Sequence, residues 1–584
     1  MPSLPALSRA AALVLALALS LIVAATPADA AYRGDNGLIA YASGGGRDGH
    51  VNFRSADGSN AQRVATNGVP VKEPVFSPSG RRIVFAGQGR LWTMYANGTL
   101  LRAVTDGSVL AREPTWSPDG RWIAFTAGPS GARRIAVIRA DGNELRYLPT
   151  GRGDDHSPAW SSRDDIAFVR RTPRGHDELY LNDPDGKQLR RLTHTKRNER
   201  EPAWSPNGRR LAFSAGRKGH RTVEALTIGA RRPKRLAGPR RDPAAPAFSP
   251  DGRRLAVTVR DGRHRQVWEM SARGGKLKRL SHSRGGAGAP DWQPLGADPV
   301  IAAAGDVGCD PAEANYNGGF GTLRHCHGRY TSDILMTMDL SGILVLGDEQ
   351  TNDGRLASWD VFDATWGRLK PLLHPVPGNH EYANPDATTY FDYFNGVGNA
   401  NGPAGLRGWG NYSFDIGSWH IVALNSQCSA SPANRAGIDC SPGSPQETWL
   451  RQDLAAHPNK CTLAFWHHPL RSSGNPGENA AVLPFWQALY AAGAEVVLNG
   501  HDHAYERLAP QDPFGNRDGV RGIRQFLVGT GGKSLQAQHW TAPWSEVRLS
   551  TFGVLQMTLG DDGYRWEFVN DYGETLDSGA NSCH

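Results

Sequence analysis

Five apolar segments in the second half of the chain each run into polar residues whose side chains can bind a metal ion. The polar clusters are Gly305-Asp306, Gly347-Asp348, Gly378-Asn379-His380-Glu381, His467-His468-Pro469 and Gly500-His501-Asp502-His503. Each apolar run has the length of a β-strand, and α/β architectures place their sites in the loops at strand ends. The sequence therefore predicts one site that is assembled from five separate strand ends.

Six side chains make up the candidate metal ligands: Asp306, Asp348, Asn379, His467, His501 and His503. Two cations about 3.5–4 Å apart can activate a bridging water and bind phosphoryl oxygens, but they need a shared anion to offset their repulsion. Asp348 is the candidate for that bridge. Oxygen ligands combined with several imidazoles favour two transition metal ions, iron, manganese or zinc, over calcium or magnesium.

In this order the clusters resemble the motifs of the calcineurin-like metallophosphoesterases, and within them those of the purple acid phosphatases. The family pattern is Asp-x-Gly, Gly-Asp-x-x-Tyr, Gly-Asn-His-Asp/Glu, x-x-x-His and Gly-His-x-His. This chain has Asp306-Val-Gly308, Gly347-Asp348-Glu-Gln-Thr351, Gly378-Asn379-His380-Glu381, Ala464-Phe-Trp-His467 and Gly500-His501-Asp-His503. The resemblance covers about residues 299–570 and implies a two-sheet sandwich flanked by helices.

The resemblance also implies a role for each ligand. Asp306 and His503 would bind the first metal, Asn379, His467 and His501 would bind the second, and Asp348 would be shared. His380 takes the place of the family histidine that contacts the substrate phosphate or protonates the leaving group. His468 and Arg471 are candidate phosphate contacts, and Asp502 and Glu381 are expected to orient ligands.

Two positions depart from the family pattern. Gly308 stands where most calcineurin-like enzymes have a histidine ligand, and Thr351 stands where purple acid phosphatases have the tyrosine that binds ferric iron. His325 or His327 could fill the first site, but water or hydroxide is the simpler replacement. We therefore expect no tyrosinate-to-iron purple colour.

The first half of the chain is a repeat. Six segments of the type EPTWSPDGRWIAFTAG place an aromatic residue at Phe76, Trp116, Trp160, Trp204, Phe248 and Trp292, with gaps of 40, 44, 44, 44 and 44 residues. This period fits one four-stranded blade of a propeller. The repeats resemble those of TolB-like propellers, which implies binding or scaffolding without chemistry of its own.

The chain enters the repeats at Gly37 with a sequence typical of a second blade strand, and it leaves them at Trp292 with a sequence typical of a first strand. We therefore expect the last strand to complete the first blade and close the ring, which removes exposed sheet edges. Single histidines, namely His156, His176, His220 and His264, are expected to be solvated loop residues. In the second half Trp409, Tyr412, Trp419 and Trp449 are expected to lie in the core.

The amino terminus has the pattern of a secretory signal. Arg9 is followed by the apolar run 11–25 and by Ala28-Asp29-Ala30, and the run is shorter than the roughly 20 residues that span a bilayer. No later segment is apolar and long enough to span. The six cysteines all lie in the second half, where disulfides are expected in an exported protein; Cys309 with Cys326 and Cys428 with Cys440 are the expected pairs.

The net charge of +8 is the sum of a basic first half and an acidic second half. Residues 1–300 carry 48 Lys and Arg against 27 Asp and Glu, whereas residues 301–584 carry 17 against 30. A basic surface can recruit nucleic acid, but here the arginines recur in turns of the repeat and do not cluster. The acidic half needs bound metal before it can attract an anionic substrate.

Together these features predict a signal peptide at residues 1–30, an all-β six-bladed propeller at 33–296 and an α/β metallophosphoesterase domain at 299–584. The leading hypothesis is a secreted hydrolase of phosphate esters in which a metal-bridged hydroxide attacks. Its propeller would hold a protein or a cell-envelope polymer. The alternatives are an extracellular binding protein with a silent metal domain, and a phosphodiesterase or nuclease. Monoester or diester substrate, metal identity, propeller ligand and oligomeric state stay open.

Overall fold

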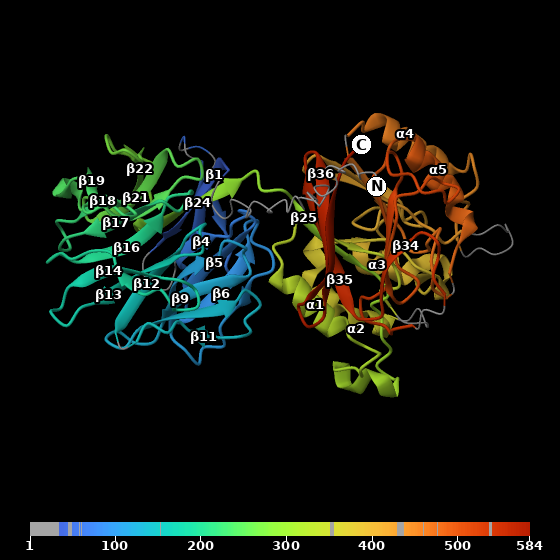
Figure 1. The fold of residues 1–584 in the computed structure, drawn as a ribbon, viewed down its shortest axis with the longest axis horizontal. Coiled ribbons are helices and arrows are strands. Elements are labelled where there is room, and N and C mark those ends of the chain that lie inside the picture. Colours follow the sequence, from blue (N-terminus) through green and yellow to red (C-terminus); the bar gives the residue numbers. More distant parts are fainter. Residues whose placement is uncertain are drawn as a thin grey trace, which may run out of the picture.

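The computed structural model describes residues 34–584 except 45–49, 56, 58, 60, 152, 351–355, 429–436, 460, 476 and 537–539. A ring of β-sheets forms one part of the molecule and a layered α/β unit forms the other (Figure 1). The expected signal sequence lies outside the described residues. Within the residues that are described, no helix combines the length and the apolar character that crossing a membrane would require.

The propeller has six sheets of four strands each. The first blade contains β24 (Ala287–Leu295), β1 (Asp35–Ser43), β2 (His50–Arg54) and β3 (Gln62–Val64), and the second contains β4 (Lys72–Phe76), β5 (Arg82–Gly87), β6 (Arg90–Tyr95) and β7 (Arg102–Ala103). The third contains β8 (Ala111–Trp116), β9 (Trp122–Ala127), β10 (Arg134–Arg139) and β11 (Arg146–Tyr147), and the fourth contains β12 (Asp154–Trp160), β13 (Ile166–Arg171), β14 (Asp177–Asn182) and β15 (Arg190–Arg191). The fifth contains β16 (Glu199–Trp204), β17 (Arg210–Ala215), β18 (Thr222–Thr227) and β19 (Lys234–Ala237), and the sixth contains β20 (Ala244–Phe248), β21 (Arg254–Asp261), β22 (His264–Ser271) and β23 (Lys278–Arg279). A short 3-10 helix, η2 (Pro239–Arg241), precedes β20.

The first and last segments of the repeat share one blade. Strand β24 pairs antiparallel with β1, with Trp292 opposite Ile39. This confirms the closure predicted from the incomplete first repeat. The regular spacing of the aromatic residues reflects their place in the inner strands. Phe76 and Trp116 end β4 and β8, Trp292 lies within β24, and all three are almost completely buried.

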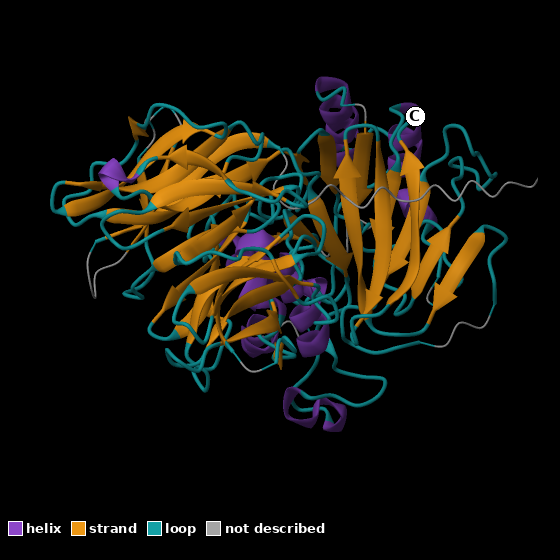
Figure 2. Cartoon of the chain, turned by 60° about the vertical axis from the view of Figure 1, so that its left-hand side comes forward, coloured by secondary structure: helices purple, strands orange, loops and turns teal. Residues whose placement is uncertain are grey.

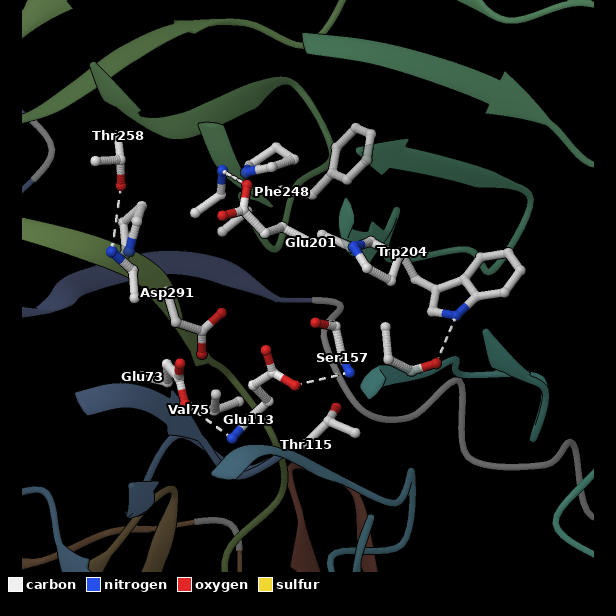
Figure 3. A pocket seen from close by; sticks show the side chains of 18 of the residues that line it. Glu73, Val75, Glu113, Thr115, Ser157, Glu201, Trp204, Phe248, Thr258 and Asp291 are labelled. Atoms are coloured by element: carbon white, nitrogen blue, oxygen red, sulfur yellow. Dashed lines mark hydrogen bonds between the residues drawn. The ribbon is translucent and has the colours of Figure 1, made fainter. Parts of the chain in front are cut away.

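The residue before proline in each inner strand has a left-handed backbone, which is unusual for residues with a side chain before proline. These residues are Glu73, Glu113, Ser157, Glu201, Ala245 and Ala289, with φ between 44° and 55°. They line a central cavity of about 450 Å³, in which the carboxylates of Glu73, Glu113 and Asp291 gather (Figure 3). Each glutamate accepts a hydrogen bond from the backbone of the next blade; the Glu73 carboxylate, for example, accepts one of 2.8 Å from the Glu113 N–H.

One histidine of the propeller differs from the expectation of a solvated loop residue. His156 lies in β12 and is 4% exposed, and its Nδ1 is 3.0 Å from Ser157 Oγ. The sequence 154–158 reads as a polar turn, but here the polar residues form the start of an inner strand.

The second domain contains two mixed sheets. The six-stranded sheet has the order β27 (Leu373–Pro375), β26 (Gly342–Val345), β25 (Val300–Ala304), β35 (Gly553–Gly560), β36 (Gly563–Asn570) and β37 (Thr575–Ser582). The seven-stranded sheet has the order β28 (Tyr412–Ile416), β29 (Trp419–Ala423), β30 (Cys461–Phe465), β31 (Val496–Asn499), β33 (Arg524–Val528), β32 (Tyr505–Leu508) and β34 (Ser545–Leu549). One core cluster joins residues of both sheets, including Ile301, Leu344, Leu463 and Leu498.

Helices flank the sandwich (Figure 2). They are α1 (Gly328–Thr337), α2 (Leu356–Ala364), α3 (Thr388–Asn395), α4 (Pro445–Ala456) and α5 (Leu483–Ala491), with 3-10 turns η3 (Ala314–Gly319), η4 (Trp366–Leu372), η5 (Glu381–Ala383), η6 (Pro385–Ala387) and η7 (Ala480–Val482). Leu450 of α4 and Phe485 of α5 pack against Val422 and Val497 of the seven-stranded sheet. The predicted two-sheet sandwich with flanking helices is thus confirmed.

Strand direction brings the polar clusters together. Strand β26 is parallel to both β25 and β27, and β30 is parallel to both β29 and β31. The carboxyl ends of parallel strands meet at one edge of a sheet, and loops at such an edge can share a site.

Three disulfides close loops of the second domain. Cys309 pairs with Cys326 and Cys428 with Cys440, as predicted, and Cys461 pairs with Cys583 across a separation of 122 residues. The last bond ties the end of the chain to the start of β30. Of the four aromatics expected in the core, Trp419 is fully buried, but Trp409 is 38% exposed because it lies in the loop that precedes β28.

Glu199 makes propeller stability depend on pH. It is completely buried in β16, where burial raises the pKa of its carboxyl to about 7 from an ordinary 4.5. Between these two values the folded chain holds a proton that the unfolded chain releases, so this contribution to stability is lost as pH rises from about 4.5 through about 7. Glutamine has the shape of the neutral acid. We expect Glu199→Gln to stabilise the protein at pH 8 by about 3 kcal/mol and to be nearly neutral at pH 4.5, measured by urea denaturation.

A stability difference between Glu199→Gln and wild type that is the same at both pH values would contradict this assignment. Exposed Glu144 provides the control, since Glu144→Gln should change stability little at either pH.

Candidate metal centre

Three of the expected ligands lie in strained turns after their strands. Asp306, Asp348 and His501 have φ of 58°, 54° and 76°, in the left-handed region that side chains other than glycine rarely adopt. Such strain persists where surrounding contacts impose it, and it concentrates at functional sites. Here the Asp306 backbone N–H donates to Gly347 O at 3.0 Å, and the His501 N–H donates to Asp306 Oδ2 at 2.8 Å.

His467 lies at the centre of the cluster and is completely buried. Its Nδ1 is 2.8 Å from the carbonyl oxygen of Leu346, which leaves Nε2 to face the other side chains. That nitrogen lies 3.1 Å from Asn379 Oδ1, 3.1 Å from His501 Nδ1 and 3.3 Å from Asp348 Oδ2.

Asp306 and His503 form the other side of the cluster. His503 Nε2 lies 3.3 Å from Asp306 Oδ1, and His503 Nδ1 lies 2.7 Å from Ser534 Oγ. A hydrogen bond to the second ring nitrogen fixes the orientation in which a histidine meets a metal. Ser534 therefore orients His503 as Leu346 orients His467. These distances join four of the expected ligands around His467 and the other two as a pair, and the backbone N–H of His501 connects the two groups through Asp306.

The residues fit a two-metal group. Asp306 is completely buried, and its Oδ1 has no hydrogen-bond partner among the described residues. Single ligand atoms of Asp306, Asp348 and His467 lie within 4.8 Å of one another. A buried carboxylate with no cation beside it would be energetically costly. Carboxylate oxygens and imidazole nitrogens are donors that suit iron, manganese or zinc.

Asp348 is held between the two sides. Its backbone N–H donates to Glu381 Oε2 at 3.0 Å, and the same carboxylate oxygen accepts from the Gly378 N–H at 2.7 Å. A Cβ on Gly378 would lie 2.2 Å from Asp348 Oδ1, so this position needs glycine. Glu381 thus contacts the backbone around Asp348 and Gly378 and not the carboxylate oxygens of Asp348, which face His380 and His467.

The charges within the cluster shift the pKa values of its histidines. Burial would lower the pKa of His467, but Asp348 outweighs burial and raises it to about 10. Burial and the neighbouring His467 lower the pKa of His501 to about 4. Asp348 and Asp306 raise the pKa of His467 and that of His503 respectively, so both rings favour the protonated form when no metal is bound, and binding of a metal to either ring would release its proton.

His380 lies at the edge of the cluster. Its Nε2 is 3.4 Å from Asp348 Oδ2, and 23% of its side chain is exposed. Its backbone N–H donates to Asp348 Oδ1 at 3.0 Å. The ring therefore borders both the buried ligands and solvent, where a substrate would enter.

His468 contacts the centre, and Arg471 is engaged elsewhere. The His468 ring centroid lies 4.4 Å from that of His501, and its Nδ1 lies 2.9 Å from Ser426 Oγ. The Arg471 guanidinium donates to Pro513 O at 3.3 Å and lies 5.6 Å from the centre of the Trp544 ring.

The positions that depart from the family pattern have different outcomes. A Cβ on Gly308 would lie 2.3 Å from backbone atoms of Gln350, so no histidine fits there. Thr351 lies outside the described residues. His327 uses both ring nitrogens, at 2.5 Å from Asp571 Oδ2 and 2.8 Å from Thr322 O, and is therefore not free to bind metal. His325 forms a backbone bridge with Ser534.

Two contacts of the centre were not predicted from the sequence. Ser534 and Ser426 are single serines in loops, and no spacing links them to the histidines that they contact. Asp502, expected to orient a ligand, accepts from Ser472 Oγ and from the Gly477 N–H at 3.1 Å and so fixes the loop after β30.

Comparison with known proteins relates both parts of the chain to families. The family described as TolB beta propeller domain matches residues 23–164 and 162–306, and the family described as calcineurin-like phosphoesterase matches residues 299–505. Purple acid phosphatase 22 of Arabidopsis thaliana is 28% identical over 262 residues, which are 41% of this chain and 57% of that protein. Purple acid phosphatase 15 of the same plant is 32% identical over 165 residues, or 26% of this chain and 28% of that protein. The chain thus spans just over half of the first relative and less than a third of the second.

Solved structures show distant similarity. Purple acid phosphatase PPD1 from yellow lupin is 14% identical with a TM-score of 0.41, covering 77% of this chain and 82% of that one. TolB from Acinetobacter baumannii is 20% identical with a TM-score of 0.39, covering 44% of this chain and 67% of that one. The chain consists of a TolB-like propeller followed by a calcineurin-like phosphoesterase domain that is similar in sequence to purple acid phosphatases.

Proposed function

We propose that the protein is a metal-dependent hydrolase of phosphate esters. The observation that carries this proposal is that six candidate ligands from five strand ends lie together. Their side chains approach one another at 3.1 to 3.3 Å in two groups, and the His501 backbone N–H links these groups by a 2.8 Å hydrogen bond to Asp306. The similarity to purple acid phosphatases supports the same class of reaction.

In this proposal Asp306 and His503 hold one metal ion, Asn379, His467 and His501 hold the other, and Asp348 is shared. Two such ions, iron, manganese or zinc, supply a hydroxide for attack and neutralise charge on the phosphoryl oxygens. The remaining side chains work by position. Ser534 orients His503, and Glu381 holds the turn of Asp348.

His380 is the proposed proton donor to the leaving oxygen. Its ring is partly exposed and its Nε2 faces Asp348, so it borders the place where the ester bond would lie. General-acid assistance of this kind is worth about 10²–10⁴ in rate. His468, beside His501, is a proposed phosphate contact; Arg471 could join it only after leaving Pro513 and Trp544.

We further propose that the protein is exported and that the propeller is its binding or scaffolding module for a protein or cell-envelope polymer. Three disulfides support the first point, because such bonds persist in oxidising compartments. The central cavity of about 450 Å³ supports the proposed binding role of the propeller.

A second candidate function is extracellular binding by a protein whose metal domain is silent. The observation that favours it is the departure from the family ligands at Gly308 and Thr351. Metal analysis separates the two, because a silent domain does not need two equivalents of transition metal. A nuclease drawn to polymers by the basic half would instead bind nucleic acid with strong salt dependence.

The ligand assignment is tested by Asp348→Ala and Asn379→Ala. Because these side chains hold the metals, both variants should lose metal content and more than about 99% of aryl phosphate hydrolysis. Asp439→Ala, which alters an exposed loop carboxylate, is the control that should keep both. Wild-type turnover by either variant in a metal-supplemented assay would refute the site.

The role of His380 is tested separately from metal binding. His380→Ala should lower kcat by about 10²–10⁴ while the bound metal stays at the wild-type level. The loss should shrink for substrates whose leaving groups need no proton, such as nitrophenolate. An equal loss for all leaving groups would contradict a proton-donor role.

The threonine at position 351 predicts the colour of the protein. Without a tyrosinate ligand, an iron-loaded sample should lack the intense visible charge-transfer band that makes related enzymes purple. The absorption spectrum of the purified, iron-analysed protein checks this. A strong violet band would show that another tyrosine binds the iron.

A further inference from the structure

A second pocket lies between the two domains. It has a volume of about 220 Å³ and is lined by residues of β5, β6 and the segment leading into β7 on the propeller side, and of α1 and η4 on the other. Figure 1 shows α1 on the side of its domain that faces β5 and β6. The pocket is separate from the metal centre and shares no residue with it.

Arg82 is a buried cation in this pocket. It is 4% exposed, and it forms no ion pair with a carboxylate within the described part of the chain. Its contacts are a long hydrogen bond to Met338 O at 3.5 Å and the face of the Trp116 ring, whose centre is 5.3 Å away. Buried charges are normally paired, because desolvation is costly.

Arg102 lines the same pocket and also lacks a carboxylate partner among the described residues. Its guanidinium donates to the carbonyl oxygens of Asp141 at 3.0 Å and Ala140 at 2.6 Å. Burial and, to a smaller extent, the nearby charge of Arg82 lower the pKa of Arg102 to about 10, against the opposing effect of the Asp141 carboxylate. The third arginine, Arg368, is paired with Asp333 at 2.8 Å. Three guanidinium groups therefore line the pocket, with the carboxylate of Asp333 paired to Arg368 and the carboxylate of Asp141 near Arg102.

An unused hydroxyl lines the pocket as well. Thr93 is 1% exposed, and its Oγ1 has no hydrogen-bond partner among the described residues. Unpaired buried donors of this kind are rare in native proteins and call for a missing partner. The remaining wall is apolar, with Met94, Leu100, Leu335, Met338 and Leu369.

We propose that this pocket binds an oxyanion carried on a short apolar body, such as an alkyl carboxylate or alkyl phosphate. The anionic oxygens would accept from Arg82, Arg102 and Thr93, and the apolar part would contact the methionine and leucine wall. Arginine favours oxyanions because its planar fork can donate two parallel hydrogen bonds. The volume lies below the usual range for drug-sized ligands, so the ligand is small.

Because both domains supply the pocket, the ligand would also fasten them together. The direct contacts across the boundary include hydrogen bonds from Ser79 and Arg81 to Asp339, and Arg81 also donates to the carbonyls of Ala297 and Asp298 in the segment that links the domains. A ligand that binds the docked form alone shifts the equilibrium towards it. The proposal does not depend on phosphoesterase activity.

The test is calorimetric titration of the full-length, metal-loaded protein with hexanoate, hexylammonium and inorganic phosphate. Hexanoate should bind with one-to-one stoichiometry and raise the melting temperature, and added chloride should weaken it. Arg102→Gln should weaken hexanoate at least tenfold and Thr93→Val about threefold, in line with the usual strength of charged and neutral hydrogen bonds. Arg121→Gln is the matched control, because Arg121 also crosses the boundary, to Glu567, but lies outside this pocket.

Three results would overturn the proposal. They are absence of hexanoate binding up to about 10 mM, equal binding of hexylammonium, and equal weakening by Arg102→Gln and Arg121→Gln. Inorganic phosphate that binds in competition with hexanoate, and as tightly as hexanoate does, would overturn the apolar part of the ligand. Thr93→Val preserves shape, so it tests the pocket even if Arg102→Gln fails to fold.

Discussion

The second domain depends on how a few charges are balanced away from water. Asp306 and Asp348 lie almost completely buried within contact of His467, and two negative charges at that depth require positive partners. Protons on histidine can balance them in part, as the raised pKa of His467 indicates. The two proposed metal ions would add the remaining positive charge, and a shared Asp348 would offset the repulsion between them. The sandwich can be understood as the frame that holds this arrangement.

Two features of the sandwich place these side chains: the direction of its strands and a disulfide bond. Parallel pairing among β25, β26 and β27, and among β29, β30 and β31, sends ligand loops from both sheets to the same place. Left-handed turns at Asp306, Asp348 and His501 aim the side chains inward, at a cost in backbone strain that the surrounding hydrogen bonds offset. The Cys309–Cys326 bond closes the loop that follows Asp306, and it packs beside the backbone of Lys533, next to Ser534.

Much of this could be predicted because it is local or periodic. The aromatic residue that recurs after 40 or 44 residues specifies a blade, and the missing first strand of the first repeat specifies closure by β24. The candidate metal ligands occur in short motifs whose residue types have few other uses. Properties that arise when distant segments meet could not be predicted: the burial of His156, the exposure of Trp409, the hydroxyl of Ser534 on His503, and the pocket in which Arg82 and Arg102 meet. No spacing in the sequence links the partners in these cases.

The most direct test of a dinuclear centre is anomalous X-ray diffraction from crystals of the protein, measured at the absorption edges of iron, manganese and zinc. Two peaks are expected about 3.5–4 Å apart, one beside Asp306 and His503 and one beside Asn379, His467 and His501, with Asp348 between them. A map with ordered side chains at these six positions and one peak or none, from metal-supplemented crystals, would contradict the account.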